Sequence, residues 1–361
     1  KQKVNVRTYS LIYGGSFGFT GSYCHTFGYL ANGAHSTTEQ PCLTDETVYQ
    51  NMLAGVLKLL AENPDAKLIS VSQDDNTGYC QCEKCTEIAL EEGVDVVGED
   101  GATEREARQS GPIIRFVNRI AQAVYDAGYT EVKIHTFAYS YSKEPPSVTS
   151  CRDNVLVQLC SDGTCSQHAL NDPTCNEWSG VYNWYCNNAV WADALVGWSK
   201  ICETIYIWDY TTNYQYYAIP YPNFDVLAEN IRFYVENNVK GIFLNAEWRD
   251  IPEFDDLRTY LCSKVYWNPN MSEAEYDECI NDFMKGYYGA GWEQIRAYYD
   301  FMEESSNKTG FCFCDANFTT FRLFRKMDIV LNEEELNAMF EEAKKAVSGD
   351  SVRLKRVEEV E

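Results

Sequence analysis

Basic residues and long apolar runs are both scarce in this sequence. Thirty Lys and Arg stand against 54 Asp and Glu over 361 residues, which gives a formal net charge of −24. A surface this negative repels phosphate backbones and anionic head groups, so no nucleic-acid partner is expected. No segment approaches the ~20 apolar residues that a membrane-spanning helix needs, so no membrane insertion is expected either.

Several catalytic signatures are also missing. The sequence contains no G-x-S-x-G, no H-E-x-x-H and no P-loop. Their absence removes the usual support for a serine hydrolase, a zincin or a nucleotide-binding protein. Histidine occurs only at positions 25, 35, 135 and 168. We expect no cofactor.

Cysteine, by contrast, is abundant. Fifteen cysteines are too many for a typical reduced cytosolic enzyme, so we expect a secreted or cell-surface protein, with the signal peptide absent from this sequence. An odd count leaves at least one thiol unpaired or bound to a metal. The tightest group, Cys80, Cys82 and Cys85, has the spacing of half a zinc site. A disulfide, free thiols, or a structural metal with a fourth ligand such as Cys42 or Cys160 all remain open.

Strand-like and helix-like patterns alternate along the chain. Short β-branched and aromatic runs predict buried parallel strands at residues 4–9, 68–72, 132–138, 155–159, 205–208 and 241–244. Helical periodicity lies between them, at 48–60, 113–124 and 224–235. Thr44 or Asp45 is the expected N-cap of the first of these helices, and Pro112 the expected first residue of the second.

These patterns predict an α/β fold, a (β/α)8 TIM-like barrel over residues 1–270 that is irregular or incomplete, because only six strands are found. An open doubly wound sheet fits less well, since no strand ends in a glycine-rich phosphate loop. A helical C-terminal region is predicted over residues 271–361. The acidic stretch 91–108 is predicted to be a solvated loop.

Carboxylates and aromatic residues follow three of the predicted strands. In a barrel the chemistry lies at the carboxyl ends of the strands. Sugar hydrolysis needs an acid for the leaving oxygen, a second group near the cationic centre, and aromatic platforms under the rings. One such Asp taken alone more often caps a helix, but three sites on separate strands favour a sugar site. The candidates are Asp74, Asp75, Trp208, Asp209, Tyr210, Asn245, Glu247 and Trp248.

Two further features concern the same site. Asp74 and Asp75 cannot both face one point without a bend, so one can act as the acid while the other orients a substrate amide. His135 lies inside a predicted strand, where it either lines the barrel or is a hydrogen-bonded core residue.

Many short runs of the sequence resemble the domain that defines glycoside hydrolase family 163. This family comprises bacterial (β/α)-barrel endo-β-N-acetylglucosaminidases that act on complex-type N-glycans, within a larger set of similar domains of unknown function. The runs are His25–Phe27, Cys42–Thr44, Ser70–Asn76, Gly78–Cys85, Arg115–Asn118, Thr136–Tyr139, Asp153–Val155, Leu159–Ser161, Gly197–Lys200, Tyr206–Asn213 and Pro222–Asp225.

The resemblance implies a retaining hydrolase with a glycan or glycoprotein substrate, in which the substrate acetamide is the nucleophile. Asp75 matches the family acid, and Asp74, usually Asn in the family, would orient the acetamide. His25 falls in a matching run and is a candidate sugar contact. Where relatives carry Glu in a Phe-Glu-Gln-Gly run, this chain has Leu244, so Glu247 is the remaining catalytic candidate on that strand.

Alternatives remain open. They are an exo-acting glycosidase on another sugar, such as a hexosaminidase or a uronic-acid-specific enzyme, and a glycan-binding barrel that has lost catalysis. A cluster of aromatic residues between Cys175 and Cys186 is expected to contact the glycan or to cover an interface. Its members are Trp178, Tyr182, Trp184 and Tyr185.

Overall fold

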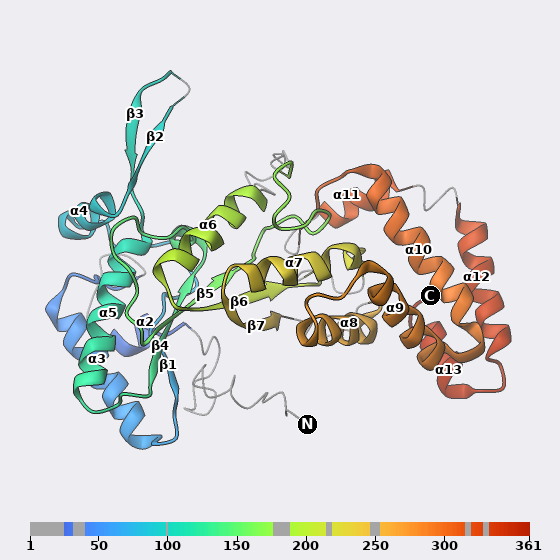
Figure 1. Cartoon of the computed structure of the whole chain (residues 1–361), viewed down its shortest axis with the longest axis horizontal. Helices are drawn as coiled ribbons and strands as arrows, with labels where there is room; N and C mark the ends of the chain where they lie inside the picture. The colour runs from blue at the N-terminus through green and yellow to red at the C-terminus, as the bar shows by residue number, and fades with distance from the viewer. Residues whose placement is uncertain are drawn as a thin grey trace. The chain divides into compact units, whose positions relative to one another are not determined.

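The computed structural model describes residues 25–31, 40–98, 100–175, 188–213, 219–245, 253–314, 319–327 and 332–361 (Figure 1). They divide into two compact units, each built from several segments. Unit 1 comprises Lys1–Cys160, Ala194–Trp208 and Asn238–Phe243, and unit 2 comprises Ser161–Asp193, Asp209–Asn237 and Leu244–Glu361. The domain division predicted at residue 270 stays a prediction.

Unit 1 is built around a curled parallel sheet of five strands (Figure 1). Its strands run in the order β1-β4-β5-β6-β7. Five of the predicted strands are thereby confirmed, and the predicted strand at 4–9 lies outside the described residues. The bounds are β1 Leu68–Ser70, β4 Lys133–Ala138, β5 Val155–Cys160, β6 Thr204–Tyr210 and β7 Val239–Asn245.

The register places polar and aromatic residues next to one another across the sheet. Ser70 of β1 lies opposite His135 of β4, and Cys160 of β5 lies opposite Trp208 of β6. Side chains alternate between the two faces of a strand. One face of β4 and β5 therefore carries Ile134, Thr136, Ala138, Val155, Val157 and Leu159, and the other carries His135, Phe137, Leu156, Gln158 and Cys160.

Helices α2 (Phe27–Ala31), α3 (Glu46–Glu62), α4 (Glu83–Glu91) and α5 (Ser110–Asp126) belong to unit 1, and α6 (Asn188–Ile201) spans both units. Asp45 caps α3 as predicted, because its carboxylate accepts hydrogen bonds from the N–H groups of Thr47 and Val48. Helix α5 begins at Ser110, so Pro112 is its third residue rather than its first. The missing N–H is tolerated there because the first turn has no intrahelical acceptor. The predicted apolar face of α5 is buried.

The acidic stretch 91–108 is not the predicted loop. Strands β2 (Val94–Val97) and β3 (Thr103–Glu106) pair antiparallel as an exposed hairpin that projects from unit 1 (Figure 1). Arg105 binds Asp95 across the hairpin at 3.0 Å. Gly101 turns the chain with a φ of +79°, a conformation that favours glycine. Neither face of the hairpin is buried, and β3 contains no apolar residue, so the two strands together lack a sustained apolar alternation in the sequence.

Unit 2 is mostly helical, which confirms the predicted helical C-terminal region. Ser272 and Glu275 form a reciprocal capping box at the start of α9. None of the helices in the described part of the chain is both long enough and apolar enough to cross a membrane. The bounds are α7 Phe224–Glu236, α8 Asp255–Trp267, α9 Glu273–Tyr288, α10 Trp292–Thr309, α11 Thr319–Lys326, α12 Glu333–Ala346 and α13 Ser351–Glu358.

Candidate active site

One face of the sheet in unit 1 carries a group of aromatic side chains, which we call the aromatic face: Phe137, Tyr139, Tyr206, Trp208 and Phe243. Trp208 lies 5.6 Å from Phe137 and 4.3 Å from Phe243, measured between ring centroids. Tyr139, Tyr206 and Trp208 are only partly buried and pack on the core beneath them. Flat, partly exposed rings of this kind can stack on the faces of sugars.

Gly241 allows one of these rings to approach the neighbouring strand closely. A Cβ atom at this position would lie 2.8 Å from the ring of Tyr206, which is closer than van der Waals contact permits. The absence of a side chain on β7 therefore leaves room for the Tyr206 ring.

Asp74 and Asp75 follow β1 and turn their carboxylates to different partners. Asp75 is exposed, and the Tyr139 hydroxyl donates a hydrogen bond to its Oδ1 at 3.0 Å. Asp74 is half-buried, and its Oδ2 accepts a hydrogen bond from the backbone N–H of Gly28, in the first turn of α2, at 2.8 Å. The bend expected after the strand is present and separates the two side chains.

Burial shifts the pKa values of Asp74 and of Tyr139, the hydrogen-bond partner of Asp75. Burial raises the pKa of Asp74, while the Gly28 N–H and the nearby His25 act in the opposite direction. Burial, followed by the charge of Asp75, raises the pKa of Tyr139. Tyr139 therefore keeps its proton and remains a hydrogen-bond donor to Asp75 across the physiological pH range.

Gln40 holds the aspartate loop in place. Its side-chain oxygen accepts a hydrogen bond from the N–H of Asp74 at 3.0 Å, and its amide group donates to the carbonyl oxygen of Asp74 at 2.7 Å and to Asn76 Oδ1 at 3.0 Å. Gln40 is itself 2% exposed. A buried side chain that satisfies three backbone and side-chain groups fixes the loop more firmly than surface contacts do.

The two candidate histidines have different environments. His25 packs against Phe137 and Tyr139, and its Nδ1–H donates to the carbonyl oxygen of Gln73 at 2.7 Å. Its position beside the aspartate loop fits the role of a sugar contact. His135 is fully buried, with Nε2 2.9 Å from Gln158 Oε1. Burial lowers the pKa of His135 to about 4, so it is a neutral core residue beneath the aromatic face.

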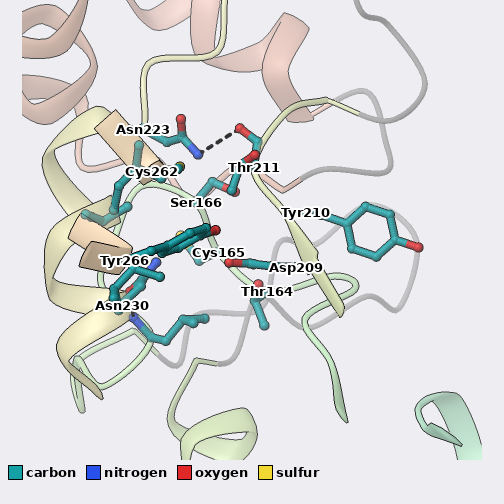
Figure 2. Close-up of a pocket in the computed structure, with 14 residues that line it drawn as sticks. Thr164, Cys165, Ser166, Asp209, Tyr210, Thr211, Asn223, Asn230, Cys262 and Tyr266 are labelled. Atoms are coloured by element: carbon teal, nitrogen blue, oxygen red, sulfur yellow. Dashed lines mark hydrogen bonds between the residues drawn. The ribbon is translucent and has the colours of Figure 1, made fainter. Parts of the chain in front are cut away.

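Asp209 occupies a separate environment in unit 2 (Figure 2). It is 7% exposed, and the Ser161 hydroxyl donates to its Oδ1 at 2.9 Å. Burial raises the pKa of Asp209. Figure 2 shows Asp209 pointing towards Cys165 and Tyr266, whereas Tyr210 points away. The cavity that Asp209 lines measures about 20 Å³, which is room for a water molecule and not for a sugar.

The sequence candidates are thus distributed over the chain. The structure brings Asp74, Asp75, His25 and Trp208 to the aromatic face and its rim within unit 1. Asp209, Tyr210 and the half-buried Asn245 belong to unit 2. That Asp75, Asp209 and Glu247 share one face stays a prediction. The remaining candidates lie outside the described part of the chain: Glu247, Trp248, Trp178, Tyr182, Trp184 and Tyr185.

Sequence reasoning overlooked three residues that shape this site. Gly28 and Gln40 lie more than thirty positions from the loop that they hold, and no local pattern connects them to it. Tyr139 directly follows the predicted strand 132–138. The rule that located Asp75, a polar group at the carboxyl end of a parallel strand, applies to Tyr139 as well.

The predicted cysteine group gains a fourth member in the structure. Cys42 joins Cys80, Cys82 and Cys85, and the four sulfur atoms lie within 4.8 Å of one another. The sulfur of Cys42 lies 3.7 Å from that of Cys82 and 3.9 Å from that of Cys85. Thiolates on one zinc ion are about 3.8 Å apart, whereas a disulfide holds its sulfurs at about 2.05 Å. Three of its members follow Asp75 in the sequence, starting five residues on at Cys80, and the sulfur spacing is that of thiolates around one metal ion.

Cys160, the other candidate for the fourth ligand, lies elsewhere. It packs in the core of the sheet with Leu68, Phe137 and Leu156. Cys160 pairs with Trp208 in the register of β5 and β6, so its side chain lies on the same face of the sheet as Trp208. The choice of Cys42 follows from the way the segment before α3 approaches α4.

A parallel, curled α/β sheet with polar residues after its strands defines a class of fold that supports many different chemistries. Comparison with protein families is more specific. Residues 9–300 match the family described as "Domain of unknown function (DUF4838)", and the chain belongs to that family. A comparison with curated proteins gives no match.

Proposed function

We propose that the chain is a glycoside hydrolase that cleaves β-linked N-acetylglucosamine within glycans, an endo-β-N-acetylglucosaminidase on N-glycans. One observation carries this proposal. The exposed carboxylate of Asp75 is held by Tyr139 at the rim of a face of partly exposed aromatic rings. A positioned acid beside stacking platforms is what cleavage of a glycosidic bond requires.

The proposed roles follow from the directions of the two carboxylates. Asp75 faces solvent and donates a proton to the leaving oxygen, then acts as the base in the second step. Asp74 is fixed through Oδ2 by Gly28, so its Oδ1 is the atom that orients the substrate acetamide. The acetamide oxygen attacks the anomeric carbon as the glycosidic bond breaks, which forms an oxazoline ring. Water, deprotonated by Asp75, then opens this ring from the opposite face, so the two inversions together retain the configuration.

Two wider inferences belong to this proposal. The curled sheet is part of a (β/α)8 TIM-like barrel that is irregular or incomplete. The protein works outside the cell or on its surface, where N-glycans are present.

The test separates acid catalysis from substrate orientation. We expect Asp75→Asn to abolish turnover of an N-glycoprotein but to retain some activity on an activated aryl glycoside, because a good leaving group does not need protonation. Asp74→Ala should reduce turnover of both substrates by about 10²–10⁴-fold. Asp65→Asn, an exposed aspartate just before β1, is the matched control and should leave both rates unchanged.

Other outcomes identify the alternatives. If Glu247→Gln is as damaging as Asp75→Asn and an oxazoline-like inhibitor does not bind, catalysis uses two carboxylates and an exo-acting glycosidase on another sugar becomes the better assignment. Mass spectrometry can show whether the unmodified protein cleaves a glycan that it binds. Binding without cleavage would identify a barrel that binds sugars but has lost catalysis.

A further inference from the structure

A second group of potential metal ligands lies in unit 2, separate from the candidate active site. Cys165, His168, Cys175 and Cys312 place one ligand atom each within 4.8 Å of one another. Three of these residues lie in the segment after β5, and Cys312 follows α10. We propose that these four residues bind one zinc ion, which fixes the segment after β5 to the end of α10.

The distances fit a single tetrahedral ion. His168 Nδ1 lies 3.4 Å from the sulfur of Cys165 and 3.6 Å from that of Cys312. Zinc bonds of about 2.3 Å to sulfur and about 2.0–2.1 Å to nitrogen, at tetrahedral angles, separate the two ligand atoms by about 3.5 Å. These two distances already match the spacing that one zinc ion imposes, and the sulfur of Cys175 lies within 4.8 Å of each of the other three ligand atoms.

Burial distinguishes this cluster from cysteines that are near each other by chance on a surface. Cys165, Cys175 and Cys312 are 2%, 1% and 7% exposed, and they form a core cluster together with Cys314. A buried set of three thiolates and a neutral imidazole around Zn²⁺ has a net charge of −1. Binding releases the three thiol protons to water, so the site holds far less charge than three bare thiolates would.

The backbone of the ligand segment is held by one buried side chain. Asn188, at the start of α6, accepts a hydrogen bond from the N–H of Cys165 at 2.8 Å and donates to the carbonyl oxygens of Cys165 and His168 at 3.0 Å each. Its own N–H donates to the carbonyl oxygen of Cys175 at 3.1 Å. Asn188 thus fixes three of the four ligands through their backbone, independently of the sulfur atoms.

The fourth ligand is placed by a separate set of contacts. The N–H of Ser166 donates to the carbonyl oxygen of Phe313 at 2.8 Å, next to Cys312. Gln167, between the first two ligands, donates from its side-chain amide to Asn307 of α10 at 2.5 Å. The two segments are therefore in register before any metal is considered, and an ion would add the remaining bonds between them.

The ligand set indicates the metal and its role. Three cysteines and one histidine at tetrahedral spacing favour zinc over calcium or magnesium, which prefer oxygen ligands. All four positions are taken by protein atoms, which is typical of a structural rather than a catalytic zinc site. Cys165 also lines the cavity of Asp209, so the ion would hold one wall of that cavity (Figure 2).

The direct test uses the unmodified chain. Crystals measured on either side of the zinc absorption edge should show an anomalous peak between the four ligand atoms. Mass spectrometry of alkylated, unreduced protein should find no disulfide among Cys165, Cys175 and Cys312. A disulfide between any two of them, or no peak at this position after purification with zinc, would overturn the proposal.

Variants give an independent measurement. Cys312→Ser should lower the zinc content by about one ion per chain relative to the unmodified protein. Cys314→Ser, in the same buried cluster but outside the four ligands, is the matched control and should retain the full content. His168→Cys should also retain it, because a fourth thiolate replaces the imidazole. Equal zinc content in Cys312→Ser and the unmodified protein refutes the assignment. Any zinc bound by the cluster of Cys42, Cys80, Cys82 and Cys85 does not affect this comparison, because that cluster is intact in every variant.

Discussion

Glu303 provides the sharpest test of the energetics inferred for unit 2. It lies on α10, is 6% exposed, and its Oε2 accepts a hydrogen bond from the N–H of Asp225 at 3.3 Å. Burial, reinforced by the charge of Asp225, raises the pKa of Glu303 to about 8, although Arg258 acts in the opposite direction. The carboxyl group is therefore protonated in the folded protein at neutral pH.

The sign of the pH effect follows from the two states. Below pH ~4.5 Glu303 is protonated in both the folded and the unfolded protein, and its contribution to stability is fully present. Between about pH 4.5 and 8 only the unfolded state loses the proton, so the free energy of unfolding falls as the pH rises. The slope is about 1.4 kcal/mol per pH unit, and the total over this interval is on the order of 5 kcal/mol.

Urea denaturation of Glu303→Gln at pH 5 and pH 8 measures this effect. The amide does not ionise, so we expect the variant to gain several kcal/mol relative to the unmodified protein on going from pH 5 to pH 8. Glu304→Gln is the matched control, because Glu304 is the exposed neighbour that contacts Lys308 on the surface. The reasoning is refuted if the difference between Glu303→Gln and the unmodified protein is the same at both pH values.

Three further predictions concern unit 1. Burial lowers the pKa of His135 to about 4, so the unmodified protein should lose stability as the pH falls from about 6.5 to 4, the opposite direction to the effect of Glu303. His135→Gln should remove this pH dependence. Equal urea curves for the two proteins over that range would contradict the prediction. Gly241→Ala should destabilise by about 1–3 kcal/mol, because its Cβ meets the Tyr206 ring, and Tyr206→Ala in the same chain should recover part of the loss in a double-mutant cycle. Gly28→Ala places a Cβ 2.7 Å from Oδ2 of Asp74, so hydrolysis of a glycoprotein should fall as it does in Asp74→Ala; full activity would show that the orientation of Asp74 is unimportant.

Local sequence patterns determined most of the secondary structure. Runs of β-branched and aromatic residues located β1, β4, β5, β6 and β7, because a buried parallel strand is apolar along its whole length. The helical period of α5 and the N-cap at Asp45 were also predicted from the sequence, because both depend on residues within a few positions of one another. The hairpin at 94–106 was overlooked because its strands are exposed on both faces.

The position of Asp75 was also within reach of the sequence. A carboxylate a few residues after a parallel strand lies near the carboxyl edge of the sheet wherever the rest of the chain goes. Its partners were not within reach. Tyr139 follows a different strand, β4, and the Gly28 N–H that binds Asp74 is 46 positions distant.

Only the tertiary structure decided which of the distant residues meet. It selected Cys42 rather than Cys160 to complete the group at Cys80, and it brought Cys312 to His168 from 144 positions away. It also buried Glu303 on a helix whose sequence resembles an ordinary surface helix. Periodicity and spacing report on neighbours along the chain, whereas metal geometry and the burial of a charge depend on contacts between segments, and those form only when the chain packs.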